Sequence, residues 1–283
     1  MALRFPVDSK FALISLTVRD APPEILFPLD LDGTLWALSE SPFEMDATWR
    51  GWLGLRVDSF ARANLYLVVV RHSDKPEILD EESKAIERRA RFIYLGLAIQ
   101  GLQFARTGLI VQGSRTESHG FQVRHIGDTS RMHHLHGARS ATVDDAILVR
   151  AGQISGTLEK LSSATPRPRL WKGVHSFVSA LESQDGADRL HGFVRSLDAM
   201  VKSPAGAGKK SFLDRCRSFA SGNDTDRVLE QLYDLRSAAE HLNGFDRVLA
   251  EYHPYREQVL CAGPSRRRSS HATSIGRSLR PQD

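Results

Sequence analysis

The chain has 283 residues, 41% of them hydrophobic and 25% charged, which is typical of globular protein and long enough for two modest domains. Its formal net charge of +4 belongs to residues 261–283, which hold five arginines against the single acidic residue Asp283. Two cysteines, Cys216 and Cys261, exclude a disulfide framework, and the longest apolar stretch, residues 92–99, is far too short to span a bilayer. We therefore expect a cytoplasmic protein with no membrane span.

The first half of the chain predicts a mixed domain of strands and helices. Residues 11–18, 24–38 and 63–70 have the apolar patterns of strands, with Pro28 and a turn at Asp32 and Gly33 interrupting the second. A helix is expected after Asp80, a further strand pair with loops within residues 107–140, and a helix over residues 144–161. We interpret three aromatic residues as core or sheet-face residues: Trp36, Trp49 and Trp52. Residues 1–150 are thus expected to form an α+β domain of unknown ligand.

The second half is almost wholly helical in pattern. Pro166 and Pro168 mark a break, and helices are predicted over residues 169–183, 187–202, 210–220, 225–242 and 245–259. Turn-forming glycines, with serine, asparagine and aspartate, separate them. The expected fold is α+β, with the N-terminal domain followed by an all-α bundle over residues 151–260. Residues 261–283 are rich in Ser, Arg, Gly and Pro, and we expect them to be a disordered basic tail.

One predicted helix carries an arginine and a histidine that could act on a phosphate. The helix over residues 225–242 has an apolar stripe, and Arg236 lies at the edge of that stripe, five positions before His241. An arginine can hold a phosphate with two hydrogen bonds, and a histidine can move a proton near neutral pH. On an ideal helix the two side chains point about 140° apart, so a helix end or a second copy of the chain would have to bring them together. Local physics also allows a purely structural reading, in which Arg236 pairs with Glu240 and His241 caps the last turn.

The sequence around these two residues resembles the signature helix of the HEPN superfamily, in which an Arg is followed after four to six residues by a His. The run Leu232-Tyr233-Asp234-Leu235-Arg236-Ser237-x3-His241 is similar to the Apea-like branch. Two earlier segments, residues 169–182 and 210–215, resemble the helical Leu-Glu and Phe-x2-Arg elements of the same branch. The resemblance covers residues 165–250, about a third of the chain. One position departs from it, because the family often has Gly directly after the His, where this chain has Leu242.

The resemblance implies a metal-independent endoribonuclease that acts as a homodimer through its helical domain. His241 would be the base or the acid, Arg236 would hold the phosphate, and Ser237, Tyr233 and Asn243 would bind RNA or support the site. A structural reading of Ser237 and Tyr233, as a backbone-bonded hydroxyl and a packing ring, stays open. The resemblance also implies RNA as partner, no cofactor or metal, a role in defence or toxin-like growth arrest, and an antitoxin or trigger protein. The alternative is a non-catalytic HEPN module that binds RNA, a nucleotide or a protein.

Three other motifs have competing interpretations. The run Asp30-Leu31-Asp32-Gly33-Thr34 matches the first motif of haloacid-dehalogenase-like phosphatases, although a hairpin turn explains the same letters. Residues 205–210 resemble a phosphate loop but lack its first Gly and its Ser or Thr, so an interhelical loop is expected. The remaining motif is a group of histidines that could bind zinc or nickel, for which a solvated loop is the favoured reading: His119, His125, His133, His134 and His136.

Overall fold

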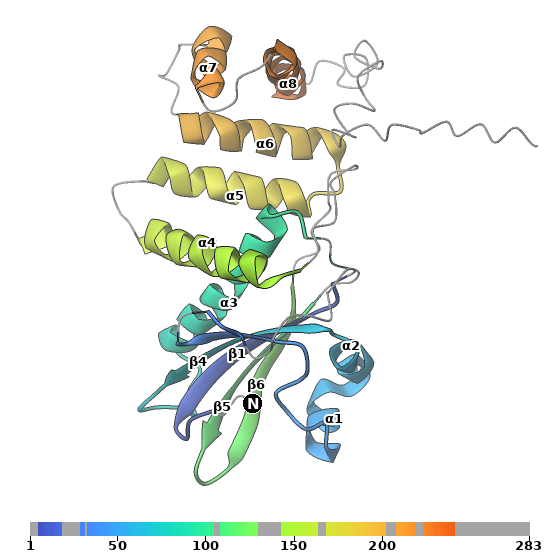
Figure 1. Cartoon of the computed structure of the whole chain (residues 1–283), viewed down its shortest axis with the longest axis vertical. Coiled ribbons are helices and arrows are strands. Elements are labelled where there is room, and N and C mark those ends of the chain that lie inside the picture. The colour runs from blue at the N-terminus through green and yellow to red at the C-terminus, as the bar shows by residue number, and fades with distance from the viewer. Residues whose placement is uncertain are drawn as a thin grey trace, which may run out of the picture.

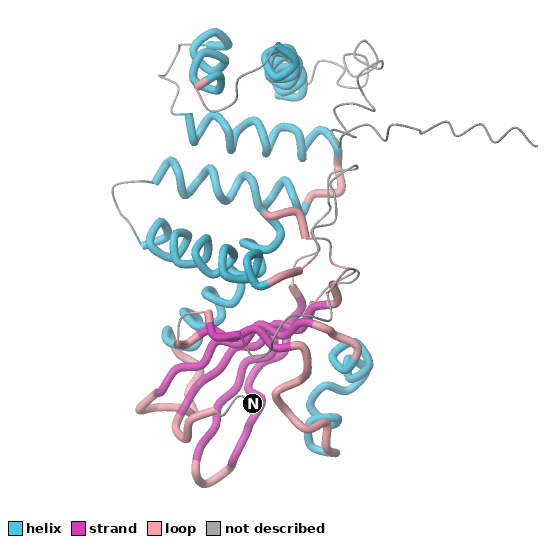
Figure 2. Tube along the Cα trace, viewed as in Figure 1, coloured by secondary structure: helices cyan, strands magenta, loops and turns pink. Residues whose placement is uncertain are grey.

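The fold is mixed α+β, as expected, with strands at one end of an elongated molecule and stacked helices at the other (Figures 1 and 2). The structure is a computed structural model. It describes residues 5–18, 29–31, 33–102, 104, 108–129, 143–163, 168–201, 208–218 and 223–240. The predicted helix over residues 245–259 and the basic tail lie outside these residues.

The first half of the described chain contains a six-stranded antiparallel sheet. Its strands are β1 Ser9–Leu16, β2 Leu29–Asp30, β3 Leu35–Leu38, β4 Leu65–His72, β5 Leu109–Thr116 and β6 Gly120–Asp128. The order is β2-β3-β4-β1-β5-β6, and every neighbouring pair is antiparallel. The strands predicted from residues 11–18 and 63–70 are therefore the two central ones, β1 and β4, and the pair predicted within residues 107–140 is the hairpin β5–β6.

Both faces of the two central strands are buried. Alternate residues of β1 and β4 point to opposite faces, and nearly all of them are covered. One face packs under α3 Glu81–Ile99 and α4 Asp145–Ser163, and the other under α1 Ala47–Leu53 and α2 Val57–Ala61. The pattern of apolar and small residues in β1 therefore reflects two apolar cores and not one wet face.

The two short helices α1 and α2 lie among the first seventy residues, where the sequence predicted strands and no helix. Asp46 caps α1, because its side chain accepts a hydrogen bond from the backbone N–H of Trp49 at 2.8 Å. Trp49 is buried, and its ring stacks on Phe43 with 4.1 Å between centroids. Trp49 and Trp52 are thus aromatics that cover the sheet, as expected, but from a helix. α1 was not predicted because it is only seven residues long and contains two tryptophans, which favour strands.

A buried lysine joins the central strand β1 to the start of α3. The Nζ atom of Lys10 lies 2.9 Å from a carboxylate oxygen of Asp80 and 2.9 Å from one of Glu82, and the hydroxyl of Ser73 donates to Glu82 at 2.6 Å. Burial lowers the pKa of Lys10, but the hydrogen bonds to the two carboxylates more than offset this, so that the pKa is raised. Asp80 also caps α3, which begins directly after it as predicted.

The six longer helices of the described chain form successive pairs. α3 packs on α4, α5 Pro168–Glu182 packs on α6 Gly186–Val201, and α7 Gly208–Arg217 packs on α8 Asn223–Glu240. In Figure 1, α6 lies between α5 and the α7–α8 pair. Two separate apolar clusters join the pairs, one between α3–α4 and α5–α6 and another between α6 and α7–α8. The described helices thus match the predicted ranges closely, but they build a stack of pairs and not one closed bundle around one core.

Small residues allow α5 and α6 to approach closely. A Cβ atom added to Gly192 would lie 2.8 Å from the Cβ of Ala180, and one added to Gly173 would lie 2.7 Å from the Cβ of Ala199. Both distances are shorter than van der Waals contact, so the pair could not pack this way with larger residues at these positions.

The first half of the chain does not end at residue 150. That residue lies within α4, whose buried Leu148 and Ala151 belong to the core between the sheet and α3. Leu158, on the same helix, belongs to the cluster shared with α5. α4 therefore contributes to both halves, and the break marked by Pro166 and Pro168 falls at the connection between α4 and α5.

Candidate functional site

The helix that carries the Arg–His motif is held against α7 by one aromatic contact and two ion pairs. The ring of Tyr233 lies 5.3 Å from that of Phe212. Lys209, at the start of α7, lies 2.7 Å from Asp234, and Arg217, at its end, lies 3.0 Å from Asp226 near the start of α8. The two helices are therefore antiparallel.

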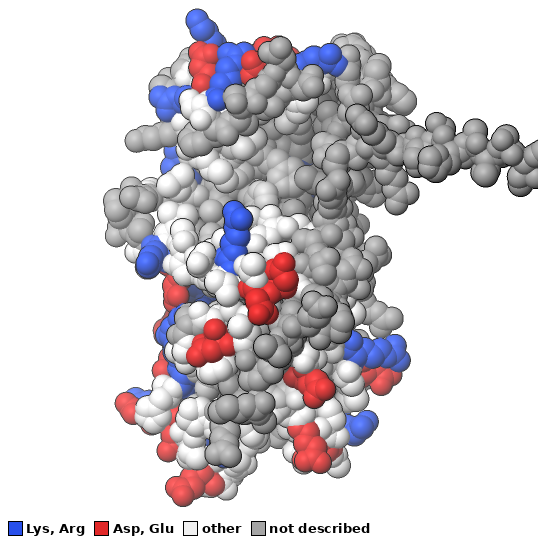
Figure 3. All heavy atoms as spheres, viewed as in Figure 1, with Lys and Arg blue, Asp and Glu red and all other residues white. Residues whose placement is uncertain are grey.

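The charges of α7 and α8 are opposite. α7 has four basic residues and one acidic residue, whereas α8 has five acidic residues and two arginines. The hydrogen bond from Arg217 to Asp226 raises the pKa of Arg217, and Asp214, 2.9 Å away, acts in the same direction. Much of the basic charge of α7 is thus matched by acidic neighbours. Figure 3 shows both signs side by side at this end of the molecule.

The structure places three of the five predicted site residues on one helix. Tyr233, Arg236 and Ser237 belong to α8, which runs as a continuous helix to Glu240. Tyr233 and Ser237 are half-buried. The backbone of Arg236 is described and its side chain is not, and His241 and Asn243 lie outside the described residues. The contact with Phe212 shows that Tyr233 has a packing role within its own chain.

A cavity that no sequence motif had indicated lies between α3 and α5. Its volume is about 310 Å³, and it is lined by the apolar residues Phe92, Leu95, Trp171, Val174 and Val178 together with Arg88, Arg91, Tyr94, His175 and Glu182. The lining residues recur at helical spacing on each helix, which is a signal present in the sequence. It could not be recognised there, because nothing in the sequence tells which two helices face each other.

The arginines, the histidine and the glutamate of this cavity differ in their surroundings. Arg91 pairs with Glu87 at 2.6 Å, whereas Arg88 is exposed and makes no ion pair or hydrogen bond with the rest of the described chain. The ring of His175 lies 4.7 Å from that of Trp171. Burial raises the pKa of Tyr94 to about 12, and the negative charge of Glu182 acts in the same direction.

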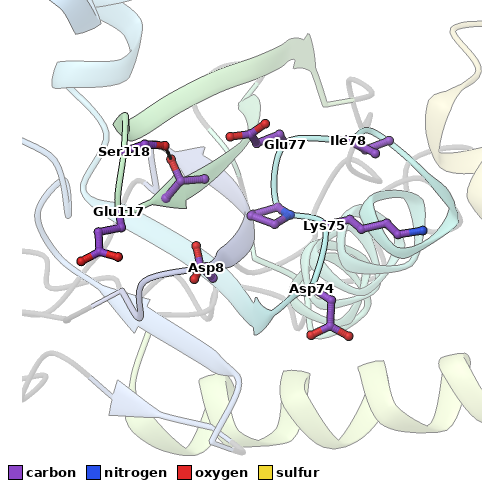
Figure 4. A pocket seen from close by; sticks show the side chains of 9 residues that line it. Asp8, Asp74, Lys75, Glu77, Ile78, Glu117 and Ser118 are labelled. Carbon is purple, nitrogen blue, oxygen red and sulfur yellow. Dashed lines mark hydrogen bonds between the residues drawn. The ribbon is translucent and has the colours of Figure 1, made fainter.

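A second cavity, of about 590 Å³, lies at the end of the sheet where the β5–β6 turn meets the start of α3. Figure 4 shows side chains from three segments around it: Asp8 before β1, residues 74–78 after β4, and Glu117 and Ser118 in the turn. Carboxylates dominate its rim, with Lys75 as the basic residue. In the part of the chain that the structure describes, however, no three His, Cys, Asp or Glu side chains are placed to hold a metal ion.

The histidines named from the sequence do not come together within the described residues. His119 lies in the β5–β6 turn, where its Nδ1 is 2.7 Å from the hydroxyl of Ser118 and 3.7 Å from Glu77. His125 is on β6. The other three, His133, His134 and His136, lie outside the described residues. The two described histidines, His119 and His125, thus do not share a site that could hold a metal ion.

The phosphatase-like run lies in an unsuitable part of the sheet. Asp30 ends β2, the two-residue strand at the edge, and its side chain accepts a hydrogen bond from the backbone N–H of Gly33 at 2.5 Å. Gly33 has a φ of +78°, which favours glycine, and β2 pairs antiparallel with β3 across this turn. The phosphatase motif requires a central parallel strand, whereas this run is a hairpin turn at an edge. Asp32 itself is outside the described residues.

Comparisons with protein-family models, with curated proteins and with solved structures gave no match to this chain. Among the helices that the structure describes, none is both long enough and apolar enough to cross a lipid bilayer.

Proposed function

We propose that this protein is a metal-independent endoribonuclease of the HEPN type that acts as a homodimer. The observation that carries the proposal is the motif at the end of α8: Tyr233, Arg236 and Ser237 follow one another on this helix, and His241 comes directly after its last described residue, Glu240. The two earlier segments that the resemblance covers, residues 169–182 and 210–215, lie on α5 and α7. The stacked arrangement of the pairs is a departure from a closed bundle.

The chemistry needs only these two residue types. A neutral imidazole takes the proton from the ribose 2′-hydroxyl, the 2′-oxygen attacks phosphorus, and a protonated imidazole gives a proton to the departing 5′-oxygen. The products are a 2′,3′-cyclic phosphate and a free 5′-hydroxyl. Arg236 stabilises the negative charge that develops on the phosphate oxygens. Since one histidine cannot be neutral and protonated at once, His241 of a second copy supplies the other role.

The charge of α8 bears on how RNA is held. Its acidic residues outnumber its basic ones, so the helix offers no extended basic surface to an RNA backbone. Within the motif, Arg236 is the one cationic side chain at neutral pH, and its loss therefore removes the phosphate contact directly. We place this activity in the cytoplasm, in defence or toxin-like growth arrest, with an antitoxin or trigger protein as regulator.

The test is RNA cleavage in excess EDTA. The full chain is expected to release fragments that end in 2′,3′-cyclic phosphate, and both Arg236→Ala and His241→Ala are expected to lower the rate at least a hundredfold. Arg227→Ala, on the same helix, and His72→Ala, on β4, are matched controls that should keep the rate. Cleavage that survives in either motif variant while the chain stays folded would refute the proposal.

Leu242 favours the alternative, a non-catalytic module that binds RNA, a nucleotide or a protein. In this alternative, a bulky residue in place of the family's usual Gly would lengthen the helix beyond His241 and would hold the imidazole away from Arg236. RNA that is bound but left intact, both by the parent chain and by Leu242→Gly, would identify this alternative. Cleavage that appears only in Leu242→Gly would show that the position of the imidazole had prevented it.

A further inference from the structure

The cavity between α3 and α5 lies apart from the motif of the proposed nuclease. α3 covers the sheet and α5 is the first helix after Pro166, whereas the motif is on α8, at the far end of the stack (Figure 1). The volume of about 310 Å³ is at the lower end of the range for ligand pockets. A ligand that fits this cavity is therefore a small molecule, and it takes no part in the cleavage of RNA.

One wall of the cavity is a stripe of side chains on α3. Arg88, Phe92 and Leu95 line the cavity at helical steps of four and three residues, so they lie on one face of the helix. Phe92 and Leu95 are buried, whereas Arg88 is exposed. At about 1.5 Å per residue, the stripe is about 10 Å long. It thus begins with a charged group at the surface and continues over buried apolar side chains.

The opposite wall, on α5, suits an alkyl chain better than a flat ring. Trp171, Val174 and Val178 line it at steps of three and four residues. The ring of Trp171 already meets two other rings almost perpendicularly, Phe92 at an interplanar angle of 85° and His175 at 78°. A ligand ring that stacked on the indole would compete with these contacts, whereas an alkyl chain packs against ring edges and valines alike. The wall therefore favours an aliphatic ligand.

The charged residues of the rim favour an anion. Arg88 makes no ion pair or hydrogen bond within the described residues, so its guanidinium is available to a ligand. Arg91 also lines the cavity, but it pairs with Glu87 at 2.6 Å. Among the described lining residues the one carboxylate is Glu182, which comes four residues after Val178 at the end of α5. A single free guanidinium suits a ligand with one carboxylate, because the two groups form a pair of parallel hydrogen bonds.

We propose that this cavity binds a medium-chain alkyl carboxylate. The carboxylate pairs with the guanidinium of Arg88, and the tail lies along α3 over Phe92 and Leu95, with Val174 and Val178 on its other side. The stripe of about 10 Å is close to the extended length of octanoate. A ligand of this class is neither RNA nor a nucleotide, so the site is independent of the Arg–His motif, whether or not that motif is catalytic.

The test is calorimetric titration of the full chain with butanoate, hexanoate and octanoate. Each added methylene should tighten binding about two- to fourfold, because the apolar walls remove it from water. Decanoate should gain little more, because its tail is longer than the stripe. Equal dissociation constants for butanoate and octanoate, or no binding of octanoate at millimolar concentration, would overturn the proposal. A gain that continued unchanged beyond octanoate would overturn the cavity as the site.

Other ligands test the head group and the tail separately. Hexanoate is expected to bind about tenfold more tightly than hexanol, which has no charge, and hexylammonium should bind most weakly, since Arg88 repels it. Phenylacetate, with a ring in place of the chain, should bind more weakly than hexanoate. Tighter binding of hexylammonium than of hexanoate would overturn the carboxylate, and tighter binding of phenylacetate would overturn the alkyl chain.

Variants with the circular dichroism of the parent chain then assign the two parts of the site. Arg88→Ala should weaken hexanoate about tenfold and leave hexanol unchanged, whereas Arg150→Ala, at an exposed arginine of α4 outside the cavity lining, should change neither. Val178→Phe fills part of the cavity and should weaken both ligands, whereas Val149→Phe, at an exposed valine of α4, should weaken neither. Equal losses in a variant and its control would contradict the assignment. His241→Ala should bind octanoate like the parent chain, so the test stands whether or not RNA is cleaved.

Discussion

The sheet and the helical stack differ in how completely their apolar residues are buried. In β1 and β4 whole strands are enclosed, and Leu13, Ile14 and Leu67 have no exposed surface. In the two clusters of the helical stack taken together, half-buried residues are as numerous as fully buried ones, and ion pairs at the surface supplement them. Because burial of apolar surface is the main source of stability, we expect the sheet to be the more stable half.

The largest effect should come from truncating a core leucine in each half. Leu67→Ala removes a side chain that is fully enclosed between the sheet and the helices above it, and it should cost about 3 to 5 kcal/mol. Leu229→Ala, on α8, removes a side chain at the edge of a smaller cluster, and about 2 kcal/mol is expected. Urea unfolding followed by circular dichroism measures both changes. Equal costs would contradict the comparison.

A smaller effect, which depends on pH, should come from Lys10→Met. The substitution keeps the volume but removes the cation between Asp80 and Glu82, and about 1 to 2 kcal/mol should be lost at pH 7. Hydrogen bonds lower the pKa of both carboxyls. The main cause is the hydrogen bond from Lys10 for Asp80, and the hydrogen bond from Ser73 for Glu82. Their contribution is therefore present above their unfolded values of 3.8 and 4.5 and is lost as pH falls through the lowered folded values.

The measurement for Lys10→Met is the urea midpoint of parent and variant between pH 2 and pH 11. The difference between them should be largest near neutral pH and should shrink in acid. It should also shrink above pH 10.5, because the raised pKa of Lys10 gives stability that is lost as pH rises through the folded value. A difference that stays constant over this range would exclude the ion pairs as its cause.

The smallest effect is expected in the helical stack, from the ion pair between Lys209 and Asp234. Both side chains are more than a third exposed, so a double-mutant cycle with Lys209→Ala and Asp234→Ala should give a coupling of about 0.2 to 1 kcal/mol. Raising the salt concentration to 1 M should reduce it. A coupling above 2 kcal/mol would show that the α7–α8 pair depends on charge more than its exposure suggests.

Local signals in the sequence predicted most of the elements. The helix expected after Asp80 is α3, and its buried residues Ile86, Ala90, Ile93 and Leu97 recur at helical spacing in the sequence. The separations between α5, α6, α7 and α8 fell at the predicted turn formers. The hairpin at Gly33 was also predicted from its residues. Signals of this kind act within a few positions along the chain, so a single sequence contains them.

The arrangement of the elements could not be predicted in the same way. Nothing near Lys10 shows that its partners are seventy residues later, and nothing near Trp171 shows that α3 lies opposite. α1 and α2 were missed because aromatic residues favour strands unless a tertiary contact holds them in a helix. The Arg–His motif was found from its residues. In the proposed dimer the second histidine comes from another copy, and one sequence does not show how two copies meet.

The order of the helical pairs has a consequence for where the molecule opens. A linear stack opens one layer at a time, as an array of repeats does, because each layer is held only by its neighbours. α7 and α8 form the last described layer, so releasing them exposes a single interface, whereas releasing α5 and α6 exposes two. The layer with the motif is therefore the least costly to detach. If a second copy docks on this layer, the amide protons of α7 and α8 should show a larger slowing of hydrogen exchange than those of any other described part of the molecule.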